Sequence, residues 1–76
     1  MDEELDLRGL KCPLPAMLAR KALARLAKGT RLVVLADDPM AVVDIPHMCH
    51  HEGHAVDGVT TRDGHSEFLL RAAEPG

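Results

Sequence analysis

The stretch RLVVLAD, residues 31–37, determines how the rest of the chain is arranged. It is a short run of leucine and β-branched residues without polar alternation, which predicts a central strand that other elements cover well. Residues 13–28 before it are rich in Ala, Leu, Arg and Lys and are followed by Gly29, so they predict a helix. Upstream of that helix, Leu5 and Leu7 alternate with charged residues, which is the period of a short strand. Two strands joined by a helix are parallel and have a right-handed crossover.

A second helix is predicted after the central strand. Asp38 is placed to cap this helix and Pro39 to take its first position. Pro46 leaves two possibilities, because it either begins a further helical stretch capped by Asp44 or kinks a single helix. Gly53 ends the helix in both cases.

The last third of the chain predicts a β-hairpin. Residues 55–62 and 65–72 flank Asp63-Gly64, a strong two-residue turn signal. The whole order is therefore β-α-β-α-β-β. It predicts an open two-layer α/β sandwich of the α+β type, with a four-stranded mixed sheet and both helices on one face. Residues 1–76 are expected to form a single domain, since a chain of this length needs all of its apolar segments for one core.

The composition excludes several classes of protein. The chain is 46% hydrophobic and 28% charged and has a net charge of −3, which is typical of a folded soluble protein. Phe68 is the only Phe, Tyr or Trp, so stacking platforms for nucleic acid are missing and no direct nucleic-acid partner is expected. No apolar stretch is long enough for a bilayer and no secretory leader is recognisable. We therefore expect a cytoplasmic monomer with free thiols and no membrane partner.

The first predicted helix has two different faces. A step of about 100° per residue brings its apolar residues together: Leu18, Ala19, Ala22, Leu23 and Leu26. Its basic residues lie on the opposite side: Arg20, Lys21, Arg25 and Lys28. The apolar face is expected in the core. The basic face is either ordinary solvated surface or a docking surface for an acidic partner.

Cys12 lies where the first strand passes into this helix. The positive end of the helix dipole and the nearby Lys11 and Arg8 are expected to favour the thiolate, so the sequence predicts a lowered pKa for Cys12. Pro13 at the first helical position and Pro15 in the first turn lose no helical hydrogen bond, and they stiffen the segment. Free cysteines are often buried, but a cysteine at a helix start after a glycine loop is expected on the surface.

Several short motifs occur together along the chain. They are LDLRGLKCPLPAMLARKAL at residues 5–23, which contains a Cys-Pro-x-Pro signature, LADDP at 35–39, DIP at 44–46, Cys49, and GH at 53–54. In these motifs, which span nearly the whole chain, the sequence resembles the TusA/SirA/YedF family of sulfur carriers. The resemblance implies the two-layer sandwich and a sulfane sulfur carried as a persulfide on Cys12, with no other cofactor. It also implies a sulfur-donor protein, either a cysteine desulfurase or a rhodanese-like enzyme, and an acceptor protein.

The residue between the two prolines differs from the family's usual pattern, since Leu14 stands where TusA proper tends to have an acidic residue. The pathway is therefore open between tRNA thiolation, sulfur oxidation, molybdenum-cofactor synthesis and selenium metabolism. We predict Cys12 as the catalytic residue. The residues predicted to bind partner proteins are Lys11, Pro13, Leu14, Pro15, Met17, Arg20 and Lys21. Met17 is included because an exposed methionine suits an adaptable docking surface.

The histidine-rich segment HMCHHEGH, residues 47–54, offers an alternative function. His47 and His51 share a helix face, so a metal-binding or regulatory module is the main alternative to a sulfur carrier. Cys49 falls beside the apolar stripe and is expected to be buried, so no metal site is predicted. It also lies about 15 Å along its helix, too far for a disulfide with Cys12. An independent thiol enzyme would need a catalytic base near Cys12, and none is recognisable in the sequence, so a sulfurtransferase-type relay protein is expected rather than an independent turnover enzyme.

Overall fold

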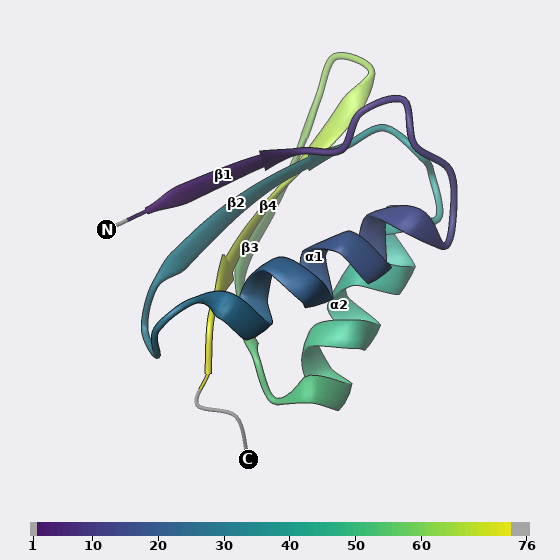
Figure 1. Ribbon diagram of the computed structural model, residues 1–76. Coiled ribbons are helices and arrows are strands. Elements are labelled where there is room, and N and C mark those ends of the chain that lie inside the picture. The colour runs from purple at the N-terminus through teal and green to yellow at the C-terminus, as the bar shows by residue number, and fades with distance from the viewer. Residues whose placement is uncertain (1, 74–76) are drawn as a thin grey trace.

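The computed structural model describes residues 2–73 and contains the elements in the predicted order (Figure 1). They are β1 (Glu3–Asp6), α1 (Leu14–Arg25), β2 (Arg31–Ala36), α2 (Ala41–Glu52), β3 (Ala55–Arg62) and β4 (His65–Arg71). The sheet order is β1-β2-β4-β3, with β1 parallel to β2 and the other two pairs antiparallel. Both helices cover the same face of this sheet. The predicted two-layer α+β sandwich is therefore confirmed.

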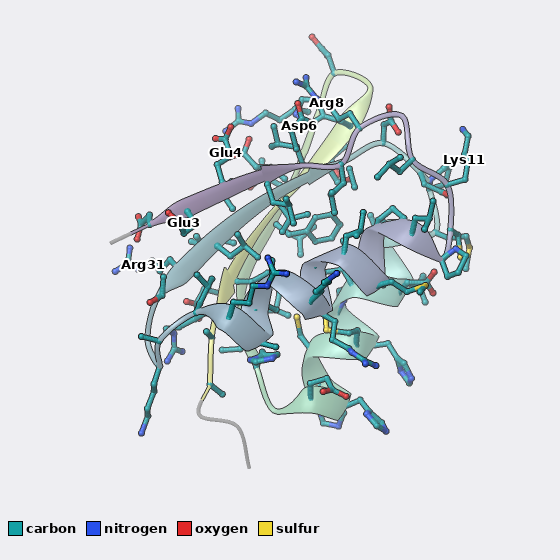
Figure 2. All side chains as sticks on the ribbon, viewed as in Figure 1. Glu3, Glu4, Asp6, Arg8, Lys11 and Arg31 are labelled. Atoms are coloured by element: carbon teal, nitrogen blue, oxygen red, sulfur yellow. The ribbon has the colours of Figure 1, made fainter. Side chains whose placement is uncertain are left out.

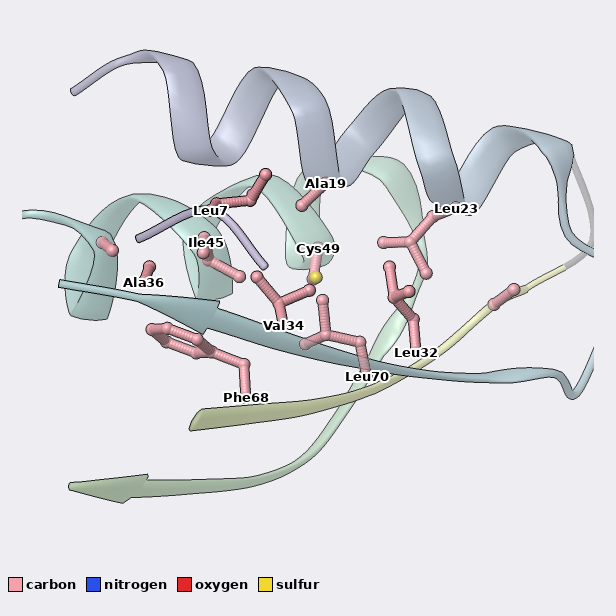
Figure 3. Close-up of a cluster of buried hydrophobic side chains, with 12 residues drawn as sticks. Leu7, Ala19, Leu23, Leu32, Val34, Ala36, Ile45, Cys49, Phe68 and Leu70 are labelled. Atoms are coloured by element: carbon pink, nitrogen blue, oxygen red, sulfur yellow. The ribbon is translucent and has the colours of Figure 1, made fainter. Parts of the chain in front are cut away.

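The hydrophobic core fills the space between the sheet and the two helices (Figure 3). Its largest fully buried side chains are Phe68, Leu23, Leu32, Ile45, Leu70, Val34, Pro15 and Cys49. In the sheet, Leu32 pairs with Leu70 and Val34 pairs with Phe68, so both central strands direct these residues to the helical layer. The prediction that 31–37 forms a central strand is confirmed, because β2 lies between β1 and β4.

The ends of α1 differ from the predicted ones. It begins at Leu14 rather than at residue 13, and it ends at Arg25 rather than at residue 28. The early end has a long-range cause, since the Gly29 N–H donates to the carbonyl of Ala72 at 2.8 Å and so ties the helix exit to the end of β4. Leu26 is already extended, and it packs against the core as the chain turns.

The face of α1 that enters the core is narrower than predicted. The buried residues of this helix are Pro15, Ala19 and Leu23, which lie four residues apart on one line. Leu18 was predicted to be in the core, but 37% of its surface is exposed. Ala22 and Leu26 of the predicted face are partly buried and pack against this core, so Leu18 is the residue that departs from the prediction.

The start of α2 also differs from the predicted one. The helix begins at Ala41, so Pro39 does not take its first position and Asp38 does not cap it. The Asp38 carboxylate instead accepts a hydrogen bond from the N–H of Met40 at 2.9 Å, in the turn before the helix. Pro46 lies inside one continuous helix, which decides between the two predicted possibilities. Gly53 ends the helix in a left-handed conformation, as predicted.

The hairpin between β3 and β4 is confirmed. Arg62 pairs with His65, so Asp63 and Gly64 form the two-residue connection. Separately, none of the helices within residues 2–73 is long and apolar enough to span a lipid bilayer.

Candidate functional site: an exposed thiol held by carboxylates

Cys12 lies in the loop between β1 and α1, at the edge of the sheet where the parallel strands β1 and β2 end. Both helices begin at this same edge (Figure 1). Its thiol is exposed, whereas Cys49, the other free cysteine, is buried in the core. The thiol therefore stands between the starts of α1 and α2, where a visiting protein can reach it.

Two consecutive carboxylates after β2 hold the backbone of this loop. Asp37 accepts the N–H of Gly9 on both of its oxygens, at 3.0 and 3.1 Å. Asp38, which is buried, accepts the N–H of Cys12 with Oδ2 and that of Met40 with Oδ1. These N–H groups, that of Cys12 first, lower the pKa of Asp38, so its carboxylate is ionised and the loop is fixed through charge-assisted hydrogen bonds.

The thiol itself contacts a third carboxylate. Cys12 Sγ donates to Asp44 Oδ2 of α2 at 2.8 Å. This hydrogen bond raises the pKa of Cys12, and partial burial and the charges of Asp44 and Asp38 add to the effect. The prediction of a lowered pKa is therefore wrong for the protein by itself.

The groups that were expected to lower the pKa of Cys12, namely Arg8, Lys11 and the N-terminus of α1, do not contact its thiol in a way that offsets the carboxylates. Arg8 donates to the carboxylate of Asp6 at 2.7 Å, and Figure 2 shows Lys11 extending from the loop away from both helices. The N-terminus of α1 also offers few free donors to the thiol. Pro15 has no N–H, the Leu14 N–H bonds to the carbonyl of Lys11 at 2.9 Å, and that of Met17 bonds to the carbonyl of Pro13 at 3.2 Å. The dipole of α1 thus does not outweigh the nearby carboxylates.

The two prolines of the Cys-Pro-x-Pro signature have different positions. Pro13 is exposed at the cap of α1, outside the first helical position that the sequence predicts, and the Cys12–Pro13 peptide bond is cis. Pro15 lies in the first turn, as predicted, but it is fully buried. Pro15 therefore supports the loop from the core side and presents no surface to solvent, unlike the other residues predicted to bind partners.

Exposed apolar side chains flank the thiol at the start of each helix. Leu14 and Met17 of α1 are 44% and 57% exposed, and Met40 and Val43 lie exposed at the start of α2. Solvent-exposed apolar side chains gathered beside a reactive group are typical of a protein-binding surface. Leu14 and Met17 were both predicted to bind partners, and the structure places both, exposed, in the first turn of α1, which begins two residues after Cys12.

A groove of about 570 Å³ runs between α1 and α2. Its lining residues are Ala16, Met17, Arg20, Lys21, Ala24, Met48, Glu52 and His54. Three predicted binding residues, Met17, Arg20 and Lys21, thus line one groove. We name it the interhelical groove. Arg25, which the sequence also places on the basic face of α1, does not line it.

The histidine-rich segment does not converge on one point. Among residues 2–73, no three His, Cys, Asp or Glu side chains are arranged to hold a metal ion. His54 accepts the N–H of Ala73 with Nδ1 at 2.9 Å, and His51 lies 3.3 Å from the carboxylate of Glu52. Burial raises the pKa of Cys49 to about 11, which leaves it as an unreactive core thiol, and the prediction that it is buried is confirmed.

Comparison with known proteins identifies the family. Residues 3–72 match the family described as sulfurtransferase TusA. The chain belongs to this TusA family. It is 39% identical to the sulfur carrier protein TusA of Buchnera aphidicola subsp. Baizongia pistaciae over 67 residues, which cover 88% of this chain and 85% of that one. The crystal structure of a SirA-like protein from Desulfitobacterium hafniense aligns with a TM-score of 0.83 and 30% identity, covering 95% of this chain and 99% of that one. Membership of the TusA family supports a role in sulfur relay.

Two residues of this TusA-family site were not found by sequence reasoning. Asp38 and Asp44 were considered only as helix caps, and neither was assigned to Cys12. A signal for Asp38 was present, because Asp37 and Asp38 follow β2 while Cys12 follows β1, and the carboxyl ends of parallel strands meet at one edge of a sheet. Asp44 belongs to the DIP motif, but nothing in the sequence pointed from that motif to Cys12, which is 32 residues away along the chain.

Proposed function

We propose that this protein carries sulfane sulfur as a persulfide on Cys12, which it accepts from one protein and delivers to another. The observation that supports this most is the exposed thiol on a loop whose backbone is fixed by the buried Asp38. A carrier needs a thiol that two different proteins can reach, and Cys49 is excluded because the core encloses it. The only group held by the carrier is the covalent sulfur itself, so no separate cofactor is involved.

The transfer needs no oxidant. The sulfur of Cys12, once deprotonated, attacks the terminal sulfur of the donor's cysteine persulfide, and a new S–S bond forms. The S–S bond of the donor breaks, its electron pair goes to the donor's cysteine sulfur, and that sulfur takes up the proton. In delivery, an acceptor thiolate attacks the outer sulfur of the Cys12 persulfide, the S–S bond to Cys12 Sγ breaks, and Cys12 leaves as a thiolate that takes up a proton. Because each step exchanges one S–S bond for another, the oxidation states balance.

The partners we propose are a sulfur donor, either a cysteine desulfurase or a rhodanese-like protein, and an acceptor protein. Docking uses the interhelical groove and the apolar side chains beside the thiol. Arg20 and Lys21 give one wall of the groove a positive charge, and Met17 and Met48 give it an adaptable apolar surface. This combination suits a partner segment that carries both apolar and acidic side chains. The pathway that receives the sulfur is left open.

Sulfur loading tests this function directly. Incubation of the wild-type protein with a cysteine desulfurase and cysteine should add the mass of one sulfur atom, and a thiol reductant should remove it. The Cys12→Ser variant should gain no mass, while its circular dichroism spectrum stays that of the folded protein. Persistent loading of Cys12→Ser would show that the sulfur is carried elsewhere.

A further inference from the structure

The contact between Cys12 Sγ and Asp44 Oδ2, at 2.8 Å, is the reverse of an activating arrangement. In most nucleophilic cysteines, a nearby cation or helix N-terminus lowers the pKa of the thiol. Here the hydrogen bond requires the proton to stay on sulfur, because an ionised carboxylate only accepts. The charged groups around the thiol are Asp44 from α2, Asp38 from the segment before α2, and Lys11 from the loop. The two carboxylates raise the pKa of the thiol itself, whereas the charge of Lys11 lowers the pKa of Asp38.

Both partners of this contact are held in place by the rest of the structure. Asp44 lies in the first turn of α2, where its N–H donates to the carbonyl of Met40 at 2.8 Å, and its side chain is only half-buried. The N–H of Cys12 is bound to Asp38, which also holds Met40. Cys12 is thus held at the start of α2 by two hydrogen bonds, one from its backbone N–H to Asp38 and one from its thiol to Asp44.

We propose that Asp44 is a positioning residue that holds the empty Cys12 thiol protonated against α2, so that Cys12 attacks sulfur only after a donor protein has displaced this carboxylate. The inference rests on the proposed function, since it concerns the empty state of the same carrier. It gives the carrier a way to remain inert toward the disulfides and electrophiles that it meets between partners.

The atoms of the loading reaction show why the contact belongs to the empty state. When Cys12 is loaded, Sγ is bonded to Cβ and to the transferred sulfur, so it carries no hydrogen. The proton it loses ends on the donor's cysteine sulfur, which leaves as the donor's S–S bond breaks. Sγ then has nothing to donate to Asp44, and the new sulfur lies about 2 Å further out. Loading therefore ends the contact between Sγ and Asp44, whereas the backbone hydrogen bonds at the start of α2 do not involve the sulfur.

The test measures how fast the empty thiol reacts with iodoacetamide, a small neutral reagent, as the pH is varied. Asp44→Asn keeps the shape of the side chain but removes its charge. We expect it to react about tenfold faster than wild type at pH 7, with the midpoint of the profile about one pH unit lower. Asp44→Glu restores a carboxylate and should return the profile toward that of wild type. Asp37→Asn is the matched control, because Asp37 lies at the same sheet edge but bonds to Gly9 rather than to the thiol.

A wild-type profile in Asp44→Asn would overturn the proposal. So would an equal acceleration in Asp37→Asn, which would indicate a general charge effect. If circular dichroism showed Asp44→Asn to be unfolded, Asp44→Ser would take its place with the same expected result. Alkylation needs no sulfur donor, so this outcome is independent of the loading test. Failure to load Cys12 would overturn the proposed function and leave the alkylation result intact, and an unchanged alkylation profile would leave the loading result intact.

Discussion

At the scale of single residues, the site is organised by carboxylates that do different things. Asp38 is buried and binds two backbone N–H groups, that of Cys12 in the segment between β1 and α1 and that of Met40 just before α2. Asp44 holds the thiol itself. A carboxylate that binds backbone N–H groups stabilises the fold while it is ionised, so Asp38 makes the geometry of the loop depend on pH.

The pH dependence of stability follows from the direction of the Asp38 pKa. The folded state lowers this pKa below the ordinary value of about 3.9, so its hydrogen bonds are fully present above about pH 4 and are lost as the pH falls through the lower folded value. Asp38→Ala should therefore reduce the urea midpoint at pH 7, and its difference from wild type should shrink as the pH is lowered toward 2. Urea unfolding at several pH values measures this. Asp57→Ala, which removes an exposed ion pair with Arg71, is the control and should have a smaller effect at pH 7. A difference for Asp38→Ala that stays constant with pH would contradict this role.

At the scale of elements, the two helices begin together at the thiol and enclose the interhelical groove. Arg20 of α1 lines that groove, whereas Arg25, one turn further on, lies outside it. Both arginines are exposed and belong to the same helix. A comparison of variants at these two positions therefore distinguishes docking in the groove from a general effect of surface charge.

Charge reversal at these two positions should have different effects on sulfur transfer. Arg20→Glu should slow transfer from a donor protein, most strongly at low ionic strength, where electrostatic attraction is least screened. Adding Lys21→Glu should slow it further, whereas Arg25→Glu should have a smaller effect. The melting temperatures should stay close to that of wild type, because exposed substitutions rarely change stability much. Stopped-flow or quenched transfer assays at two salt concentrations measure the rates. Equal slowing by Arg20→Glu and Arg25→Glu would place docking outside the groove.

The end of α2 depends on the backbone of one glycine. Gly53 has a φ of 83°, and its N–H bonds to the carbonyls of Cys49 and His50. A side chain would meet no neighbouring atom there, so the cost of Gly53→Ala comes from the left-handed backbone alone, about 1 kcal/mol. Gly58→Ala in β3 is the control, because that position also has open space and no left-handed backbone. Chemical denaturation should show a loss for Gly53→Ala and little change for Gly58→Ala; equal losses would contradict the backbone explanation.

At the scale of the whole molecule, stability depends on a small core and a narrow helix stripe. Leu23 and Leu18 are both leucines of α1, but Leu23 is 1% exposed and Leu18 is 37% exposed. Leu23→Ala should destabilise the fold by about 2–5 kcal/mol, a large share of the stability of a small domain. Leu18→Ala should cost well under half as much, because less of its surface is removed from water. Denaturant unfolding of both variants measures the difference, and similar losses would mean that the stripe is wider than Pro15, Ala19 and Leu23.

The order of the elements could be predicted from the sequence because local signals determine it. The apolar run at 31–37, the turn residues Asp63 and Gly64, and the helix end at Gly53 each act within a few neighbours. The C-terminal bound of α1 could not be predicted, because the chain after the helix is tied to Ala72 by the Gly29 N–H, a contact between residues far apart in the sequence. Leu18 was wrongly predicted to lie in the core, because a helical wheel of α1 does not show how much of the helix surface the sheet and α2 cover.

The position of the reactive thiol could be predicted, but its chemical state could not. The Cys-Pro-x-Pro signature and the expected helix start put Cys12 on the surface, as observed. The raised pKa comes from Asp44, which the fold brings to the thiol from another helix, and local charges such as Lys11 gave the opposite expectation. Sequence reasoning about a pKa thus failed where the decisive group is distant along the chain.

The most direct test of the claim that Cys12 carries the sulfur is a single loading reaction that contains two variants, Cys12→Ser and Cys49→Ala. Their intact masses remain distinct with and without one added sulfur atom, so one spectrum reads both after incubation with a cysteine desulfurase and cysteine. Because both variants share the same donor, any difference comes from the cysteine that each retains. We predict that Cys49→Ala gains one sulfur atom, removable by a thiol reductant, and that Cys12→Ser gains none. Equal gains on the two variants, or a gain on Cys12→Ser alone, would contradict the account.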